Sequence, residues 1–381
     1  MKGSQDPPLL AAWKRTVRRS PESLAVREIE GGLRRSRRQL DRDAARWAEC
    51  EDPHGPGWRG RVRFFSLPNC AAWFATFLWI LKRGGIPAPL DPGEPPEVRE
   101  RIARGAPLAA AFDDPRCSLL KLTSGSTGSP RALPFTGRQM LADGAHICAT
   151  MGIRPDDVNL AVVPFGHSYG LGNLVIPLLA QGTAVACAVA ALPHPIAKAA
   201  AAARATVFPA VPRLLEALAD SELPAGAFPV LRLVISAGAP LEPALARRFR
   251  ERFGIAIHNF YGSSETGGIA YDRTGDAGLT GRAAGTPLRG VRVSFGPARR
   301  FLVRSAAVHT LGNRRVRTSA ALGEHAPADR GRKNADGELV LLGRVGRLLK
   351  IAGRRLDPAE VERALRAAGG VRDCFVGVHP E

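Results

Sequence analysis

Lysine, paired cysteines and long apolar runs are scarce in this chain. Only seven of its 54 basic residues are lysines. Its six cysteines form no CxxC pair and adjoin no histidine cluster, which argues against a zinc finger or a disulfide scaffold and predicts core residues in a reducing cytoplasm. The start of the sequence lacks the apolar core of a signal peptide. The longest apolar helix candidate, residues 71–81, is about half of what a bilayer crossing needs, so we expect a cytoplasmic protein without a membrane span.

Acidic residues are also few, since 35 of them accompany 54 basic residues and leave a formal net charge of +19. Such a charge raises the alternative of nucleic-acid binding. No zinc-finger spacing or interleaved aromatic pattern accompanies it, and clusters such as Arg34, Arg35, Arg37 and Arg38 are typical of solvated helix faces. We therefore predict no specific nucleic-acid partner.

Apolar runs and helical periods alternate from about residue 60 to residue 260, which predicts βα units on largely parallel sheets. The clearest unit is a buried strand over 230–238, an amphipathic helix over 243–254 and a second strand over 255–260. We interpret the Pro/Gly cluster at 87–96 as a loop. With 45% hydrophobic residues in 381, the chain is long enough for a large multi-layer α/β domain whose parallel or mixed sheets are flanked by helices.

The C-terminal residues have a different pattern. Residues 347–358 predict a hairpin that turns at Gly353, and Asp357 is a suitable N-cap for the helix that follows. One hairpin, one helix and one strand are too few to bury a core of their own. We therefore expect a large N-terminal domain over 1–344 and, over 345–381, the truncated beginning of a small α+β lid.

The most informative stretch is LTSGSTGSPR, at residues 122–131, where five hydroxyls are interleaved with glycines and a cation follows. Glycines let a backbone approach an anion, hydroxyls donate hydrogen bonds to it, and a guanidinium offsets its charge. The string does not match the GxxxxGK[ST] nucleotide loop. A flexible Ser/Gly linker is the alternative, but the apolar pair Leu119 and Leu120 before it and Pro130 within it favour a strand that enters a fixed polyphosphate loop.

A second polar string, NFYGSSETGG, occupies residues 259–268 at the exit of a predicted strand. Tyr261 offers a flat face for a base, Asn259 offers an amide for its edge, and Glu265 is a carboxylate suited to a hard divalent cation. Each residue alone has a plainer interpretation. Tyr261 is more often a packing aromatic, Glu265 is more often a solvated carboxylate, and Arg344, further along the chain, is more often an ion-pair partner. Their order and spacing together favour a nucleotide site.

These strings resemble motifs of the adenylate-forming superfamily, which includes acyl- and aryl-CoA ligases, firefly luciferase and the adenylation domains of peptide synthetases. LTSGSTGSPR is similar to the family's phosphate loop, and NFYGSSETGG is similar to its Tyr-Gly-x-Thr-Glu adenine and magnesium motif. Other similar segments stand in the family's order, among them PFGHSYGLG, SAGAPL and GELVLLGRVGRLLKIAGRRLDP. The resemblance covers roughly residues 30–381.

The resemblance implies ATP and Mg²⁺ as cofactors and a two-step reaction. A carboxylate attacks the α-phosphate to give acyl-AMP and pyrophosphate, and the acyl group then passes to a thiol of CoA or of an acyl or peptidyl carrier protein. The family's phosphate-binding positions fall on Thr123, Ser124, Gly125, Ser126, Thr127 and Gly128. Its nucleoside-binding positions fall on Gly238, Ala239, Pro240, Asn259, Tyr261, Gly262, Ser264 and Arg344. Its metal-binding positions fall on Glu265 and Thr127.

His167, in PFGHSYGLG, occupies the segment that flanks the carboxylate pocket in the family. Amino-acid-activating relatives carry there an Asp that pairs with the amino group of the substrate, whereas Gly166 and His167 stand in this chain. The resemblance therefore implies an aryl or fatty acyl carboxylate as substrate, with His167 near its carboxylate. A core histidine that is hydrogen-bonded to the backbone is the alternative.

Several positions depart from the family's pattern. Arg131 replaces the final Lys of the phosphate loop, which keeps the charge but changes its geometry. Ser264 replaces a Thr, and Gly346 replaces the Asp of the hinge. The family's Asp that binds both ribose hydroxyls is expected near residues 317–325, where Ala320 or Ala321 stands.

The family's catalytic Lys is expected to lie beyond the end of this sequence, in the lid. We therefore expect slow adenylation by this chain alone, with Arg131 or Lys350 as the candidate replacement cation. The candidate catalytic residues are Glu265, Arg131, His167, Arg344 and Lys350. A degenerate nucleotide-binding protein of the same fold is the alternative to a ligase.

Overall fold

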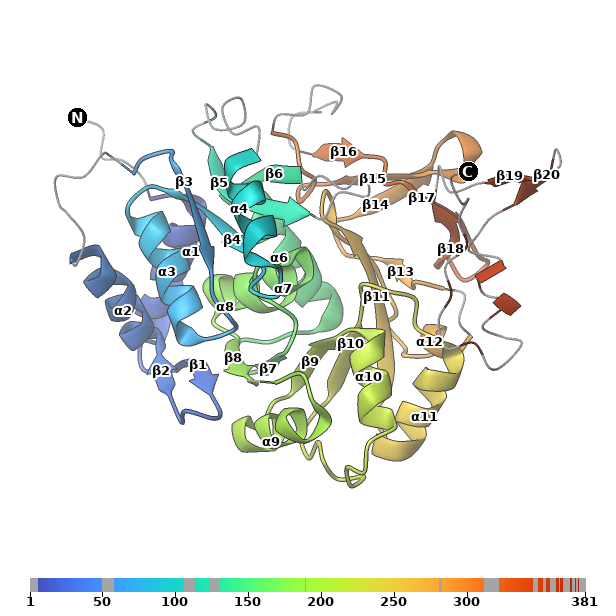
Figure 1. Cartoon of the computed structure of the whole chain (residues 1–381), viewed down its shortest axis with the longest axis horizontal. Helices are drawn as coiled ribbons and strands as arrows, with labels where there is room; N and C mark the ends of the chain where they lie inside the picture. The colour runs from blue at the N-terminus through green and yellow to red at the C-terminus, as the bar shows by residue number, and fades with distance from the viewer. Residues whose placement is uncertain are drawn as a thin grey trace.

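The computed structural model shows a layered α/β protein in which helices cover both faces of one large sheet (Figure 1). The described residues are 6–49, 58–105, 114, 116–123, 131–188, 190–280, 283–311, 322–344, 349–351, 354–356, 361–362, 364–365, 371, 374 and 376. The predicted fold class is confirmed.

The large sheet has nine strands and a parallel centre. In order across the sheet they are β13 (Thr286–Pro287), β12 (Gly267–Tyr271), β11 (Ile257–Ser263), β10 (Leu233–Ser236), β9 (Val207–Ala210), β7 (Val158–Ala161), β8 (Ala184–Cys187), β1 (Leu24–Glu28) and β2 (Arg34–Ser36). Pairing is parallel from β1 to β11 and antiparallel at both edges. The segments that follow β9, β10 and β11 therefore leave the sheet at one carboxyl edge, where α/β proteins bind their ligands.

Two apolar layers lie on opposite faces of this sheet. Successive strand residues point to opposite faces, so Phe208 and Val234 pack in one layer while Val207 and Leu233 pack in the other. The first layer is completed by α9 (Pro193–Ala203), α10 (Pro212–Ala219) and α11 (Pro243–Phe253). The second face is covered by α6 (Gly137–Met151) and, further along the sheet, by α1 (Pro8–Arg19), α2 (Arg37–Glu49), α3 (Ala71–Lys82) and α8 (Ile176–Gln181). The remaining helices are α4 (Pro96–Gly105), α7 (Ser168–Gly170), η1 (Leu171–Val175), α12 (Ala277–Thr280) and η2 (Pro297–Arg299).

The βα unit predicted over residues 230–260 is present as β10, α11 and β11. Pro243 begins α11, and Gly254 ends it in the left-handed conformation. The predicted apolar stripe, Leu245, Phe249 and Phe253, is buried against the sheet. Helix periodicity and capping residues alone therefore placed this unit correctly.

The apolar segment 71–81 lies in α3 (Ala71–Lys82), and every residue of this helix except Ala72 and Lys82 is buried. Trp73, the third residue of α3, makes aromatic contacts with Phe65, Phe77 and Phe165. Among the described residues, no helix has the length and apolar character needed to cross a membrane.

Smaller sheets lie beside the large one. The three-stranded sheet consists of β14 (Arg292–Phe295), β15 (Phe301–Ser305) and β16 (Gly323–His325). The two-stranded sheets pair β3 (Val62–Ser66) with β4 (Ile86–Leu90), β5 (Cys117–Thr123) with β6 (Arg131–Thr136), β17 (Asp329–Lys333) with β18 (Leu339–Arg344), and β19 (Leu349–Ile351) with β20 (Arg354–Leu356). The β19–β20 hairpin was predicted, although Gly353 at its turn lies outside the described residues. The domain boundary at residue 344 stays a prediction.

The interpretation of residues 87–96 as a loop is wrong in its first part. Residues 86–90 form β4, which runs parallel to β3 although it contains Pro87 and Pro89. The amide of Ile86 donates to the carbonyl of Arg61, and backbone amides alternate in direction along a strand. Both prolines therefore fall at positions whose amide direction points away from β3, so neither removes a hydrogen bond from this ladder.

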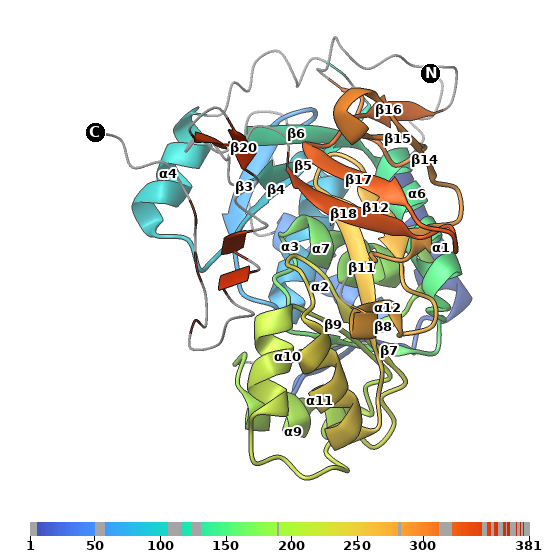
Figure 2. The ribbon, with the colours of Figure 1, turned by 90° about the vertical axis from the view of Figure 1, so that its right-hand side faces the viewer.

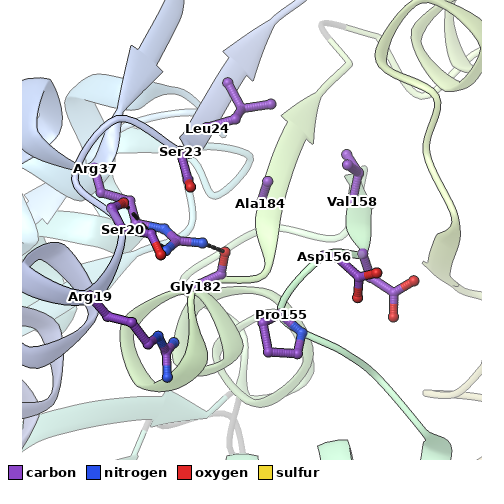
Figure 3. Close-up of a pocket in the computed structure, with 11 residues that line it drawn as sticks. Arg19, Ser20, Ser23, Leu24, Arg37, Pro155, Asp156, Val158, Gly182 and Ala184 are labelled. Atoms are coloured by element: carbon purple, nitrogen blue, oxygen red, sulfur yellow. Dashed lines mark hydrogen bonds between the residues drawn. The ribbon is translucent and has the colours of Figure 1, made fainter.

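Arg37 departs from the predicted solvated face. It is buried and donates hydrogen bonds to the carbonyls of Ser20, at 3.4 Å, and Gly182, at 2.8 Å (Figure 3). These carbonyls end α1 and α8, where a cation is favourable. Arg37 also lines a cavity of about 320 Å³ at the amino ends of β1, β7 and β8. That cavity therefore lies at the sheet edge opposite the candidate residues.

Candidate functional site

Two of the predicted segments meet at the carboxyl edge of the large sheet. Gly238, Ala239 and Pro240 follow β10 and are exposed. The neighbouring strand β11 carries the second polar string, and its register places Asn259 opposite Ser236, the last residue of β10. Gly238 has a φ of 88°, a conformation that glycine adopts without strain.

Tyr261 connects this edge to the β17–β18 hairpin. Its hydroxyl donates a hydrogen bond to Oδ2 of Asp329 at 2.8 Å. Asp329 begins β17 and pairs across the hairpin with Arg344, the last residue of β18. Figure 2 shows β17 and β18 beside β11 and β12. An aromatic ring, a carboxylate and the backbone of Arg344 are thus brought together from distant parts of the sequence.

The other predicted residues of the second string also have partners within the protein. The side-chain amide of Asn259 donates to the carbonyl of Ala283 at 3.2 Å. Gly262 lies on β11 opposite Gly268. The hydroxyl of Ser264 accepts a hydrogen bond from the hydroxyl of Ser168 at 3.0 Å. The predicted contact of Asn259 with a base edge stays a prediction.

Glu265 lies in the turn that joins β11 to β12. Its side chain is half-buried, and its backbone carbonyl accepts the N–H of His309 at 2.8 Å. Burial, together with the charges of His325 and Lys121, lowers the pKa of His309 to about 4, against the opposing charge of Glu265. Burial also lowers the pKa of Lys121, and the charges of Asp143 and Glu265 oppose that shift. Glu265 is therefore near enough to His309 and Lys121 for its charge to oppose both pKa shifts.

The predicted phosphate loop connects the two strands of a hairpin. β5 ends at Thr123 and β6 begins at Arg131, and these two residues pair across the ladder. The strand expected before the loop is therefore confirmed. Ser124, Gly125, Ser126, Thr127 and Gly128 lie outside the described residues, as do the side chains of Thr123 and Arg131. Their contacts with phosphate stay predictions.

His167 is exposed, with 54% of its side-chain surface accessible, so the core-histidine alternative is wrong. Its Nε2 lies 2.6 Å from Oδ2 of Asp91. Asp91 directly follows β4 and was overlooked in the sequence. The available signal was an acidic residue at the exit of a parallel strand. Because residues 87–96 were interpreted as a loop, the strand before Asp91 was not recognised.

The profile of the AMP-binding enzyme family matches residues 106–295, a range that holds both polar strings and His167. The chain belongs to this adenylate-forming family. It is 30% identical to the benzoate–CoA ligase of Thauera aromatica over 67% of this chain and 51% of that protein. It is 28% identical to the sulfoacetate–CoA ligase of Cupriavidus necator over 68% of this chain and 54% of that protein. The chain thus spans about half the length of these two curated relatives.

Solved structures share the fold. The ATP-bound MatB structure from Rhodopseudomonas palustris matches with a TM-score of 0.80 over 97% of this chain and 85% of that chain, at 21% identity. At that identity the likeness shows the architecture of an adenylate-forming enzyme and leaves the substrate open.

Asp329 is a second site residue that sequence reasoning missed. The ribose-binding carboxylate of the family was expected near Ala320 or Ala321, which lie outside the described residues. The structure instead places a carboxylate, Asp329, against Tyr261. Asp329 is the hairpin partner of Arg344, but the β17–β18 hairpin was not predicted from the sequence, so no sequence signal led to Asp329.

Two predicted cations are described only in their backbone. Arg344 ends β18, and Lys350 lies on β19 opposite Arg355 of β20. Neither side chain is among the described ones. Their catalytic assignments stay predictions.

Proposed function

We propose that the protein is an ATP-dependent, AMP-forming ligase that joins a carboxylic acid to a thiol. The hydrogen bond between Tyr261 and Asp329 carries the proposal. It sets a flat ring for adenine beside a carboxylate that can accept hydrogen bonds from ribose hydroxyls. The exposed Gly238–Pro240 segment at the same edge supports an adenine pocket. The curated relatives named above are CoA ligases, which supports CoA as the thiol, with a carrier protein as the alternative.

The reaction joins two anions. A carboxylate oxygen attacks the α-phosphorus and pyrophosphate leaves, which forms acyl-AMP; a thiolate then attacks the acyl carbon and AMP leaves. The protein has to align the reactants and offset their charge. Arg131 and the phosphate loop would hold the phosphates. His167, held by Asp91 at 2.6 Å, would face the carboxylate of the acid.

The residues present fit a Mg²⁺ ion that binds together with ATP. In the described part of the chain, no three His, Cys, Asp or Glu side chains gather into a metal cage. Mg²⁺ usually binds one or two protein carboxylates and substrate phosphates, so a full cage is not needed. Glu265 would supply the carboxylate and Thr127 a hydroxyl. Bound there, the ion would neutralise phosphate charge.

Removing the Asp329 carboxylate tests the nucleotide assignment. We expect Asp329→Ala to weaken ATP binding by about 1–3 kcal/mol, because it removes the acceptor for the ribose hydroxyls. The wild type should prefer ATP to 2′,3′-dideoxy-ATP, and the variant should bind both alike, as measured by calorimetry. Asp336→Ala, on the exposed turn of the same hairpin, is the control. An undiminished preference in Asp329→Ala would refute the assignment.

A panel of carboxylic acids tests the substrate class. With ATP present, aryl or acyl carboxylates should raise the unfolding temperature more than free amino acids do, because His167 stands where amino-acid-activating relatives carry an acid. A ligand at a hundred times its Kd adds about 2.7 kcal/mol of stability. His167→Ala should lose the effect of the acid and keep that of ATP, and His194→Ala, at an exposed site on α9, should keep both. Stronger protection by an amino acid would overturn this assignment.

A further inference from the structure

Asp143 is a buried carboxylate on α6, only 3% exposed. Its Oδ1 accepts the backbone N–H of Gly268 at 2.9 Å. Gly267 has a φ of 70°, and a Cβ on it would collide with the carboxylate of Asp143. The carboxylate is therefore packed directly against the backbone at the start of β12.

Lys121 is the nearby buried cation. It lies on β5, two residues before Thr123, and is only 1% exposed. Its ammonium stands over the ring of Phe135, 4.2 Å from the centroid. The negative charges of Asp143 and Glu265 oppose the effect of its burial. A buried ammonium needs such counter-charges, because removal of one partner leaves an uncompensated charge.

The turn that carries Glu265 is held from two directions. On one side the N–H of His309 donates to the carbonyl of Glu265 at 2.8 Å. On the other side Asp143 holds Gly268, three residues further along. Between them, the hydroxyls of Ser263 and Thr266 lie 3.0 Å apart and close the turn on itself. The backbone of the turn is therefore held at Glu265 itself and at Gly268.

We propose that Asp143 is a positioning residue for Glu265: it fixes the backbone of Gly267 and Gly268 and so orients the metal-binding carboxylate. The inference rests on the proposed function, which assigns Glu265 to Mg²⁺. Neither Asp143 nor Lys121 was singled out in the sequence as a site residue. A pair that only stabilises the fold would leave metal affinity unchanged once its charges are removed together.

Two double variants separate these roles. Lys121→Met with Asp143→Asn removes both charges and keeps an amide oxygen that can accept the N–H of Gly268. Lys121→Met with Asp143→Leu removes the same charges and the acceptor, at similar side-chain size. We expect the Leu pair to need about tenfold to a hundredfold more metal, the usual effect of losing a group that orients a metal ligand. The Asn pair should resemble the wild type.

The measurement is calorimetric ATP binding by the full chain at a series of Mn²⁺ concentrations and in EDTA, with thermal unfolding in parallel. Affinity for ATP in EDTA should be equal in the wild type and both pairs. If Asp143→Leu prevents cooperative unfolding, Asp143→Ala in the Lys121→Met background gives the same comparison with a smaller side chain.

If ATP binding by the wild type depends on Mn²⁺ but the Asn and Leu pairs have equal metal affinity, the proposed role of Asp143 is wrong and the assignment of Glu265 stands. A wild type that binds ATP equally well with and without Mn²⁺ would overturn the assignment of Glu265 as well. Failure of the proposed function and failure of this inference therefore give different results.

Discussion

Replacement of Glu265 by Gln is expected to slow carboxylate-dependent pyrophosphate release by about a hundredfold to a thousandfold, the usual cost of losing one preorganised electrostatic group at a reacting centre. Gln has the same size but no charge, so it holds a divalent cation weakly. The Mg²⁺ concentration needed for half-maximal rate should also rise. Pyrophosphate release across a Mg²⁺ titration measures both effects.

The control for this substitution is Glu251→Gln, on the exposed face of α11. It makes the same chemical change away from the carboxyl edge and should leave the rate unaltered. Thermal unfolding of both variants should stay near that of the wild type, because Glu265 is only half-buried. An unaltered metal requirement in Glu265→Gln would show that another group holds the cation.

Sequence patterns predicted the elements of the fold well where the signal is local. The β10–α11–β11 unit follows from Pro243, Gly254 and the spacing of Leu245 and Phe249, all within one helix. The strand before the phosphate loop and the β19–β20 hairpin also follow from short apolar runs beside glycines. Periodicity and capping report on neighbours along the chain, so they succeed for such elements.

The same patterns missed the polar partners of the site. Asp329 is 68 residues from Tyr261, Asp91 is 76 residues from His167, and Asp143 is 125 residues from Gly268. No local spacing connects the members of these pairs, because the tertiary fold alone brings them together. The resemblance to adenylate-forming enzymes identified one member of the first two pairs through its motif, and the structure supplied the carboxylate partner.

Arg37 shows the same limit for charged residues in general. The sequence places it beside three other arginines and predicts a solvated face, whereas helix geometry turns this one side chain inward to the carbonyls that end α1 and α8. The hydrogen-bond partner of Arg37, Gly182, is 145 residues away along the chain. No local pattern therefore distinguishes Arg37 from the neighbouring arginines. A charge cluster therefore predicts an average environment and not the environment of each member.

Acidification is expected to destabilise the protein through His309. Burial lowers the pKa of this imidazole to about 4, whereas in the unfolded chain it is near 6.5. Between these values the unfolded state binds a proton that the folded state does not bind, so stability falls as the pH falls. The full difference corresponds to about 3 kcal/mol, of which about 2 kcal/mol is lost between pH 7 and pH 5.

His309→Leu should make this acid limb shallower by that amount. The Nε2 of His309 has no hydrogen-bond partner among the described residues, so an apolar side chain of similar size should cost little at neutral pH. Urea unfolding at the two pH values, in EDTA so that no bound metal contributes, measures the effect. His194→Gln, at an exposed site on α9, should leave the pH dependence unaltered.

Because burial also lowers the pKa values of His146 and His325, part of the acid sensitivity should persist in His309→Leu. A limb as steep as that of the wild type would show that His309 is already protonated in the folded protein, and that the charge of Glu265 outweighs the effect of burial.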